Sequence, residues 1–434
     1  MDAHGSPNEK LLKRRPRAHS LRHIETDTGH HLPSSFMDKT PAGSDTPESC
    51  NSPVLVASRS FLSLKTRGGL AEDLLTGRWI VNPVSSFKLL MIPILLYINW
   101  ELLGPYVAPN LANPITPLLF ISYPIPDSSP DDPRYAKGYL DLAFLAFHIV
   151  FYSFLRQFIT IILCHPIARY FGIKKQGKLD RFGEQGYALL YFAVMGAWGY
   201  RVMGQLPTWW FRTEHFWIGY PHWQMKPELK RYFLMHASYW CQQLIVLLLG
   251  LEKPRKDYNE LIMHHFVTLW LVGWGYLCNL TLIGNAIYMS MDIPDAFLAF
   301  SKLLNYMGWH RLKVASLVVF LVAWTPSVTS GIGLNLVILW SVWFEFDLID
   351  ESNRVWAPDT GAWLVWWMKY QMVFPISILQ MLNIFWYYLI WRIVIRSLRD
   401  VEVTDVRSDD EDDSDDDDDD DDDDEDDSKD TKED

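Results

Sequence analysis

Long apolar segments alternate with short polar segments through most of this chain. Eight of them approach the roughly 20 apolar residues that a helix needs to cross a bilayer. They lie near residues 87–106, 140–164, 185–205, 232–251, 261–282, 286–306, 313–341 and 363–391. Trp and Tyr gather near the segment ends, as aromatic rings do at the headgroup level of a membrane. The pattern predicts an all-α, polytopic transmembrane protein with about eight spans.

The charges of the loops test this number of spans, because cytosolic loops carry an excess of Lys and Arg. If the N-terminus is cytosolic, the cytosolic loops contain Arg169–Arg181, Lys253–Lys256, His310–Lys313 and Arg392–Arg399. Two opposite loops are acidic or neutral, at Asp127–Asp132 and Glu345–Glu351, whereas loop 206–231 is mixed. The charges favour eight spans with both termini in the cytosol. Seven or six spans are the competing numbers, because segment 286–306 contains two Asp and a Pro.

Both ends of the chain are polar. Residues 1–60 are rich in Ser, Pro and charged residues and contain no apolar stretch typical of a cleavable signal peptide. Residues 400–434 hold 24 Asp and Glu against 3 Lys and Arg, so the charge of this tail is −21. Because the whole chain has a net charge of −13, the remaining residues together carry +8. We expect a disordered basic arm over 1–60, an interfacial segment over 61–83, a first span with a lumenal loop over 84–135, a membrane domain over 136–400 and a disordered acidic tail over 401–434.

Two serines in the tail match the pattern of an acidophilic kinase such as casein kinase 2. Ser408 and Ser414 are each followed three positions later by an acidic residue. Each phosphate would add about −1.5 to −2 charges. That adds little beside ten consecutive Asp at 415–424. We expect phosphorylation of both serines with modest effects on activity; a dispensable, solubilising tail is the alternative.

Ionisable side chains inside membrane spans are costly and usually functional, and two groups of them stand out in the predicted spans. His264 and His265 are near the cytosolic start of the fifth span, and Asp292 and Asp295 share one helix face in the sixth. Structural roles compete with this interpretation. A histidine in a helix is often a hydrogen-bonded packing residue, and the two Asp can neutralise Lys302 or Arg201. Their occurrence in consecutive spans favours a functional site.

A metal site is the less favoured interpretation. Membrane desaturases and hydroxylases use several histidine boxes of the HxxxH and HxxHH type, and the body of this chain, residues 85–400, contains none. The other histidines of the body, at 148, 165, 215, 222, 236 and 310, occur singly, and adjacent helical histidines chelate poorly compared with an i, i+4 pair. The four cysteines show no paired spacing. We therefore predict no metal ligand.

Several motifs resemble the ceramide synthases, the longevity-assurance family with the TRAM–Lag–CLN8 type of membrane domain. They are Arg181–Gln185, Trp217–Pro221, Tyr239–Gln243, Lys256–Glu260, His264–Leu269, Tyr276, Asn279, Thr281, Gly284, Met291-Asp292, Asp295, Lys302 and Asn305-Tyr306. The resemblance covers about residues 85–400, and the basic arm and acidic tail are most similar to the fungal branch. One departure is Pro294 between the two Asp, where the family pattern has Ser and where a proline can kink the helix.

The resemblance implies a six-helix catalytic bundle within 136–400 and a multi-pass protein of the endoplasmic reticulum. It implies a sphingosine N-acyltransferase that transfers a fatty acyl chain, expected to be very long, from acyl-CoA to dihydrosphingosine or phytosphingosine. The implied partners are acyl-CoA as co-substrate, the sphingoid base, membrane lipids, and a small single-span regulatory subunit or a homo- or heterodimer. No other cofactor and no nucleic acid are expected. A non-catalytic, lipid-sensing or translocon-associated protein of the same fold is the alternative. A transporter is disfavoured, because the sequence shows neither inverted repeats nor broken helices.

The resemblance assigns roles to individual residues. Catalysis falls to His264, His265, Asp292 and Asp295, and substrate binding to Lys302, Tyr276, Asn279 and Trp240. CoA phosphates can pair with Lys174, Lys175, Lys178, Arg181, Arg255 and Lys256, although a plain positive-inside signal is the favoured interpretation of these cations.

An imidazole can attack the thioester to form an acyl-imidazole, or it can act as a general base for the amine. Glu260, one turn before His264, favours His264 as the nucleophile. If the fifth and sixth spans form a simple hairpin that turns near residue 283, Asp295 lies about 12 Å deeper than His264. A direct contact between the two is therefore not expected, whereas Lys302 is level with the histidines.

Overall fold

The computed structural model describes residues 69–252, 257–328 and 334–399, which belong to a unit spanning 51–434. In these ranges the chain is helical, with three isolated β-bridges and no strand. The all-α class is therefore confirmed. The arm 1–60, the tail with Ser408 and Ser414, and the loop residues Arg255 and Lys256 lie outside the described residues.

Within the described ranges, nine long helices form the body of the protein. They are α4 (Pro83–Val107), α6 (Asp141–Phe158), α8 (Gln176–Met203), α9 (Pro227–Leu248), α10 (Tyr258–Leu277), α11 (Thr281–Tyr306), α12 (His310–Val328), α13 (Leu334–Phe344) and α14 (Met368–Arg399). Shorter helices are α2 (Leu70–Leu75), α3 (Arg78–Val81), α5 (Thr116–Leu119), the π-helix η1 (Ile159–Cys164) and α7 (His165–Tyr170). Short 3₁₀ turns lie in the loops, at Trp209–Phe211, Thr213–Phe216, Phe346–Leu348, Glu351–Asn353 and Pro358–Thr360.

The helices coincide with the eight apolar segments, and segment 313–341 is divided between α12 and α13. Three stretches, Pro83–Val107, Asp141–Tyr170 and Met368–Ile395, are long and apolar enough to cross a membrane by length and composition. The number of eight spans therefore stays a prediction. α9 and α11 have a lower hydropathy because they bury polar side chains, among them His236, Gln242 and Asn285. α8 has a lower hydropathy because its first turns carry charged residues, at 178–184.

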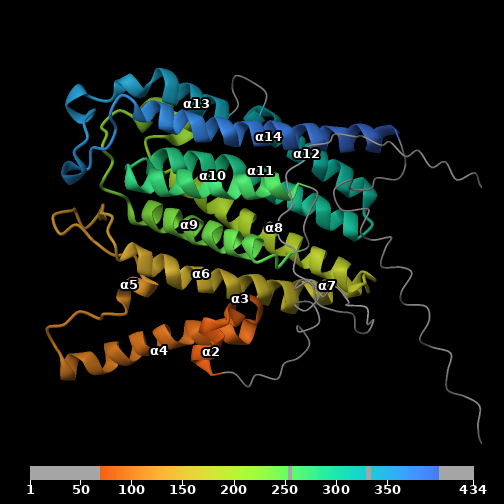
Figure 1. The fold of residues 1–434 in the computed structure, drawn as a ribbon, viewed down its shortest axis with the longest axis horizontal. Coiled ribbons are helices and arrows are strands. Elements are labelled where there is room, and N and C mark those ends of the chain that lie inside the picture. Colours follow the sequence, from red (N-terminus) through yellow and green to blue (C-terminus); the bar gives the residue numbers. More distant parts are fainter. Residues whose placement is uncertain (1–68, 253–256, 329–333, 400–434) are drawn as a thin grey trace, which may run out of the picture. The chain divides into compact units, whose positions relative to one another are not determined.

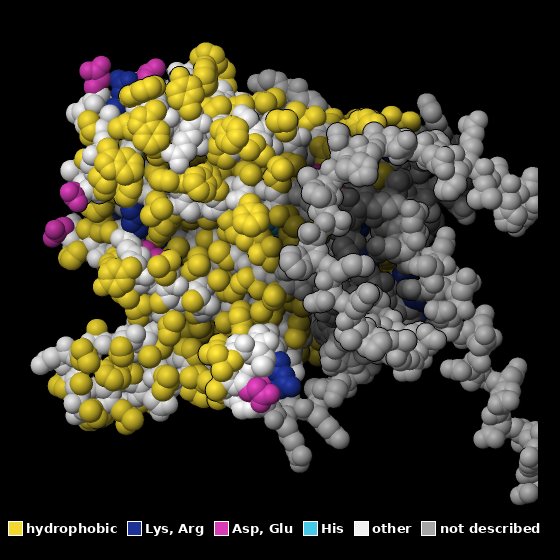
Figure 2. Space-filling view, in the orientation of Figure 1, with side chains coloured by type: hydrophobic (Ala, Val, Ile, Leu, Met, Phe, Trp, Pro, Cys, Tyr) yellow, Lys and Arg dark blue, Asp and Glu magenta, His cyan; other side chains and the backbone are white. Residues whose placement is uncertain are grey.

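The long helices lie side by side, with α11 in contact with α8, α9, α10, α12 and α13 (Figure 1). α4 packs mainly on α6 and stays largely exposed. α14 closes the other side against α10, α12 and α13. Apolar side chains cover the broad visible face of the bundle, and acidic and basic side chains gather at one of its edges (Figure 2). α11 also continues through Pro294 as a single helix.

The loops between helices meet at one end of the bundle. Tyr220 donates a hydrogen bond from its hydroxyl to the Cys278 carbonyl (2.9 Å), and the Asn353 amide donates to the Tyr220 carbonyl (2.8 Å). The Lys137 amine donates to the Tyr276 carbonyl (3.3 Å) at the C-terminus of α10. Burial lowers the pKa of Lys137 to about 8, against an opposing effect of Cys278. Loops 108–137, 204–226 and 345–367 thus form one connected cap, here called the loop cap.

Glycines allow α8 to approach its neighbours closely. A Cβ at Gly183 would lie 2.3 Å from Thr160 Cγ2, and one at Gly186 would lie 2.3 Å from Cys164 Sγ, so this part of α8 touches the π-helix η1. Farther along, a Cβ at Gly196 would lie 3.2 Å from Ile293 Cγ1 and 3.5 Å from Asp292 Cβ. Small residues at such positions permit the close helix packing that is common in membranes. The glycines thereby fix the distance between α8 and α11.

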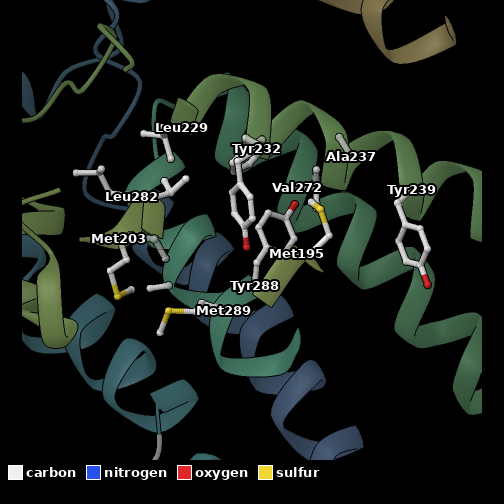
Figure 3. Packing of buried hydrophobic residues seen from close by; sticks show 14 of the residues in the cluster. Met195, Met203, Leu229, Tyr232, Ala237, Tyr239, Val272, Leu282, Tyr288 and Met289 are labelled. Atoms are coloured by element: carbon white, nitrogen blue, oxygen red, sulfur yellow. The ribbon is translucent and has the colours of Figure 1, made fainter. Parts of the chain in front are cut away.

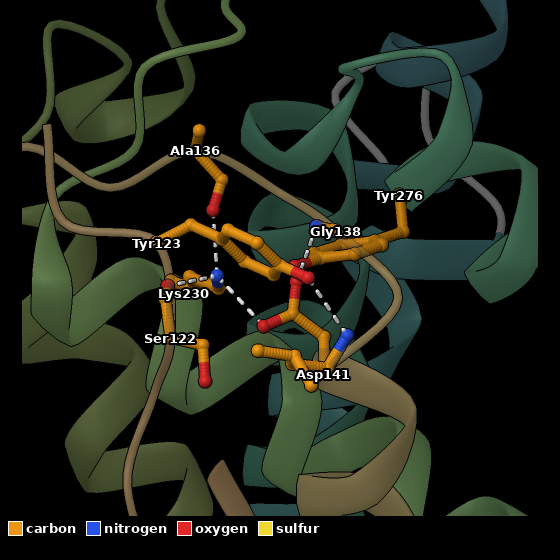
Figure 4. Close-up of polar contacts among 8 residues, drawn as sticks. Ser122, Tyr123, Ala136, Gly138, Asp141, Lys230 and Tyr276 are labelled. Carbon is orange, nitrogen blue, oxygen red and sulfur yellow. Dashed lines mark hydrogen bonds and ion pairs between the residues drawn. The ribbon is translucent and has the colours of Figure 1, made fainter. Parts of the chain in front are cut away.

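A buried ion pair joins the loop cap to the bundle (Figure 4). Lys230 Nζ of α9 lies 2.8 Å from Asp141 Oδ1 of α6, and both side chains are almost fully buried (0% and 3% exposed). Lys230 also donates to the Ser122 carbonyl (2.7 Å), and the Tyr276 hydroxyl donates to Asp141 (2.7 Å). Charges buried in apolar surroundings are tolerated when they are paired and hydrogen-bonded in this way. The pair therefore fixes α6, α9, α10 and the loop cap together.

We predict that Lys230→Met destabilises the protein by about 3–5 kcal/mol, because Asp141 keeps its charge inside the bundle without its cation. Arg201→Ala is the matched control. It breaks a pair with Glu228 in which the arginine side chain is 70% exposed, and such exposed pairs contribute little to stability. Thermal unfolding in detergent can be followed through the reaction of the buried thiols of Cys164 and Cys278 with a dye. Equal decreases in the unfolding temperature of the two variants would contradict the prediction.

Candidate active site in the bundle

A cavity of about 350 Å³ lies between α8, α9, α10, α11, α12 and α14. Most of its lining is apolar, and its polar side chains come mainly from Gln185, Trp240, Gln243, Glu252, Asp257, His264, His265, Asp292, Asp295, Lys302 and Asn383. Along α10 the cavity runs from Leu261 to Cys278, a distance of about 25 Å at 1.5 Å per residue. It therefore has a polar end near the histidines and a long apolar end beneath the loop cap.

His265 has a defined proton arrangement. Its Nδ1 lies 2.8 Å from the Leu261 carbonyl, which can only accept, so Nδ1 carries the proton. In the neutral ring, Nε2 then has a free lone pair. The side chain is only 7% exposed, and it lines the cavity. An imidazole in this state can act as a nucleophile or as a base.

Aromatic rings enclose the two histidines. The Trp240 ring lies 5.5 Å from both imidazoles, and the Trp386 ring lies 5.4 Å from His264 (centroid distances). Trp386 is itself oriented by its Nε1, which donates to Asp257 Oδ2 (3.0 Å). The histidines therefore occupy an ordered, largely water-excluding wall, in which Trp240 takes the cavity-lining place expected of a substrate-binding residue.

The two carboxylates lie on α11, and both line the cavity. Asp292 is 1% exposed, and its Oδ2 lies 3.2 Å from Nε2 of His236 in α9. Arg201, one of the cations considered for neutralising the Asp pair, instead pairs with Glu228 at 3.0 Å. Within the described residues, the imidazole that meets Asp292 is thus His236 and neither member of the adjacent pair.

Lys302 lines the same cavity two turns beyond Asp295. The chain turns at Asn279, between the end of α10 and the start of α11, and not near residue 283. The predicted offset of about 12 Å is therefore wrong, because counting from this turn brings Asp295 level with His264 and leaves Lys302 about two turns beyond.

Two other predicted substrate-binding residues have partners elsewhere. The Tyr276 hydroxyl is bonded to Asp141, and the Asn279 amide donates to the Gly361 carbonyl (2.8 Å). Asn279 has a positive φ of 59°, at the turn between α10 and α11, a conformation that asparagine tolerates better than most residues. Neither side chain is among those that line the cavity. Their geometry explains a structural role, and the predicted binding role stays a prediction.

The predicted CoA-binding cations lie at the end of the bundle opposite the loop cap, around the start of α8. They are Lys174, Lys175, Lys178 and Arg181, and none of them is among the lining residues of the cavity. Arg181 Nη1 lies 3.7 Å from Glu184 of the same helix. A cation nearer the cavity is Arg156 of α6, whose Nη2 lies 2.8 Å from Oε1 of Glu252, a lining residue.

Sequence reasoning missed His236 and the Arg156–Glu252 pair. Arg156 carried a detectable signal, because it is a charged residue inside a predicted span. His236 carried the same signal inside the segment 232–251, but nothing indicated its partner, which is 56 positions away along the chain. The site therefore joins side chains from α9, α10 and α11 with the neighbouring pair from α6 and the loop before α10.

The sequence is similar to those of several known proteins. Residues 181–392 match the TLC domain of the TRAM, LAG1 and CLN8 family. The chain is 38% identical over 343 residues to sphingosine N-acyltransferase lac1 of Schizosaccharomyces pombe, covering 77% of this chain and 85% of that protein. It is 37% identical over 300 residues to ceramide synthase LAG1 of Saccharomyces cerevisiae, covering 69% and 70%. Ceramide synthase 4 of Bos taurus is 28% identical over 230 residues, covering 53% and 54%.

Proposed function

Because this chain belongs to the ceramide synthase family and is a membrane-bound sphingosine N-acyltransferase, we propose that acyl transfer takes place at the polar end of its cavity. The observation that carries the proposal is the free Nε2 lone pair of His265, beside His264, in a cavity that also contains two carboxylates. The substrates are a fatty acyl-CoA and a sphingoid base. The apolar end of the cavity fits an acyl chain, and the carboxylates fit the ammonium group of the base.

The overall reaction converts an acyl thioester and an ammonium into an amide, a thiol and one proton. In one route, the imidazole attacks the thioester carbonyl, the carbon–sulfur bond breaks, and the amine then displaces the imidazole from the acyl-imidazole. In the other, the imidazole takes a proton from the amine while the amine attacks the thioester directly. In both, Asp292 and Asp295 hold the ammonium and can receive its first proton. Glu260 favours His264 as the nucleophile, whereas the defined tautomer favours His265.

We place the protein in the endoplasmic reticulum, with eight spans and both termini in the cytosol. This orientation is supported by the basic residues Lys174, Lys175 and Lys178 at one end of the bundle and by the acidic loops at the other. The histidines, two turns into α10, then lie near the cytosolic face where acyl-CoA arrives. A small single-span subunit, or a homo- or heterodimer, is the proposed assembly.

The purified protein, incubated with acyl-CoA and dihydrosphingosine or phytosphingosine, is expected to form ceramide detectable by mass spectrometry. We predict that His264→Ala and His265→Ala each reduce turnover by about 100-fold or more, because each removes an acid–base or nucleophilic group. Folding is checked by the thiol-reactivity assay. Near-normal turnover of both variants would refute the catalytic assignment. An acyl adduct found by intact mass and mapped by peptide analysis identifies the nucleophile.

Asp292→Asn and Asp295→Asn are expected to lose most activity, about tenfold or more. An amide of the same shape keeps the packing on α11 but loses the charge that holds the ammonium. The decisive measurement is kcat/KM for the sphingoid base at saturating acyl-CoA. Activity within about twofold of wild type for both variants would restore a purely structural role for the pair.

We predict that Gly275→Leu shifts the product toward shorter acyl chains. Gly275 lines the cavity 11 positions beyond His264, and a Cβ there would meet only Phe233, at 3.7 Å. A leucine side chain therefore projects into the cavity and shortens it. Gly273→Leu is the matched control on the same helix, because nothing lies within 4 Å of a Cβ at that position. Chain-length distributions from a mixture of acyl-CoAs distinguish the two, and identical distributions would contradict the cavity assignment.

A further inference from the structure

A histidine outside the family motifs lies directly against Asp292. His236 of α9 is fully buried, and its Nε2 lies 3.2 Å from Asp292 Oδ2. Its other ring nitrogen, Nδ1, lies 3.0 Å from the hydroxyl of Tyr191 in α8. Among the described residues, this contact lacks the geometry of a regular hydrogen bond, and neither Nε2 nor Oδ2 has another hydrogen-bond partner. Three helices thus contribute to one buried chain, Tyr191–His236–Asp292.

The orientation of the imidazole is fixed by aromatic rings. Tyr288 stacks on it with a centroid distance of 4.1 Å and an interplanar angle of 4°, and Tyr232 meets it edge-on at 4.5 Å. Tyr288 lies one turn before Asp292 on α11, and Figure 3 shows the Tyr232 and Tyr288 rings pointing toward each other inside the core. A ring held on two sides keeps its nitrogens aimed at Asp292 and Tyr191.

His236 stands behind Asp292 as viewed from the cavity. Asp292 and Tyr288 line the cavity, whereas His236 is not among the lining residues. The absence of a side chain at Gly196 lets α8 approach α11 beside Asp292. His236 therefore touches the carboxylate and does not touch the space that the substrates occupy.

We propose that His236 is a positioning residue for acyl transfer: it donates from Nε2 to Oδ2 of Asp292 and so holds the carboxylate for the ammonium of the sphingoid base. The proposal rests on the function of Asp292 proposed above. The substrate that His236 affects through Asp292 is the primary amine, the sphingoid base. The binding of acyl-CoA does not depend on it. His236 is thus a determinant of amine use, separate from the His264–His265 pair.

The proton arrangement is consistent with this role. The Tyr191 hydroxyl can donate to Nδ1, which leaves the single proton of a neutral imidazole on Nε2, facing Oδ2. Oδ2 is then occupied, and Oδ1 is the oxygen that binds the ammonium and receives one of its protons. Loss of that proton leaves the amine nitrogen with a free lone pair, which attacks the acyl carbon. A fixed donor behind a reacting carboxylate contributes by orientation, as oriented groups do in catalytic triads.

A merely structural role predicts different behaviour. If His236 only packs the core, its replacement weakens folding and affects both substrates alike, whether or not Asp292 is present. If it acts through Asp292, its effect disappears once the carboxylate is gone. Coupling between two residues in contact is measured by a double-mutant cycle.

The experiment compares His236→Phe, Asp292→Asn and the double variant with wild type, using kcat/KM for the sphingoid base and KM for acyl-CoA. We expect His236→Phe to lower kcat/KM for the base by about tenfold or more, with KM for acyl-CoA within about twofold. The double variant should fall within about twofold of Asp292→Asn alone. His236→Gln, whose amide can donate to Oδ2, should recover part of the loss. If His236→Phe does not fold, His236→Gln and Tyr191→Phe are carried through the same cycle.

His148→Phe is the matched control. His148 of α6 is partly buried, stacks on Phe144 at 3.8 Å and bonds to the Phe144 carbonyl, away from Asp292, so both kinetic constants should stay unchanged. Additive losses in the cycle, or an equal rise in KM for acyl-CoA, would overturn the role of His236 while leaving the proposed function intact. Wild-type activity of Asp292→Asn would instead overturn the use of Asp292 and the inference with it.

Discussion

The cost of burying charge in an apolar bundle determines how this protein is organised. An isolated charge in such surroundings costs several kcal/mol, so each buried ionic group must meet a partner. The partners here come from other helices or loops: Lys230 with Asp141 at 2.8 Å, Arg156 with Glu252 at 2.8 Å, and His236 with Asp292 at 3.2 Å. Each pair fixes the depth and rotation of two segments at once. The helices that carry the site are therefore located by polar contacts as well as by apolar packing.

These three pairs lie at different depths along the axis of the bundle. The Lys230 pair lies under the loop cap, the His236 pair lies beside the middle of the cavity, and the Arg156 pair lies near the start of α10. The apolar length of the cavity falls between polar contacts at its two ends. This arrangement suits a reaction between two amphiphilic substrates, each of which has a polar reacting group and a long apolar chain. The site can meet the polar groups at one depth while the chains remain among apolar side chains.

The site also depends on the close approach of the α8 and α11 backbones. Gly196 of α8 leaves room for Ile293 and for the Cβ of Asp292, so α8 and α11 pack without an intervening side chain. Tyr191, less than two turns earlier on α8, thereby reaches His236. A larger residue at Gly196 would move the tyrosine, the histidine and the carboxylate apart together. The geometry of the carboxylate side of the site thus depends on a residue without a side chain.

The sequence by itself determined the helical class, the approximate positions of the long helices and the family, because apolar runs of this length form helices and because the His264-His265 and Asp292–Asp295 spacings are specific to that family. It did not predict that segment 313–341 is divided between α12 and α13. Trp240 and Lys302, which the sequence assigned to substrate binding, line the same cavity as the motif residues, and their binding role stays a prediction. The sequence also did not predict that His236 meets Asp292, that Tyr276 bonds to Asp141, or that Asn279 bonds to Gly361. Those contacts join residues 56, 135 and 82 positions apart. Only the tertiary structure decided them, because the rotation and depth of each helix follow from packing against all its neighbours and are not encoded in any local pattern.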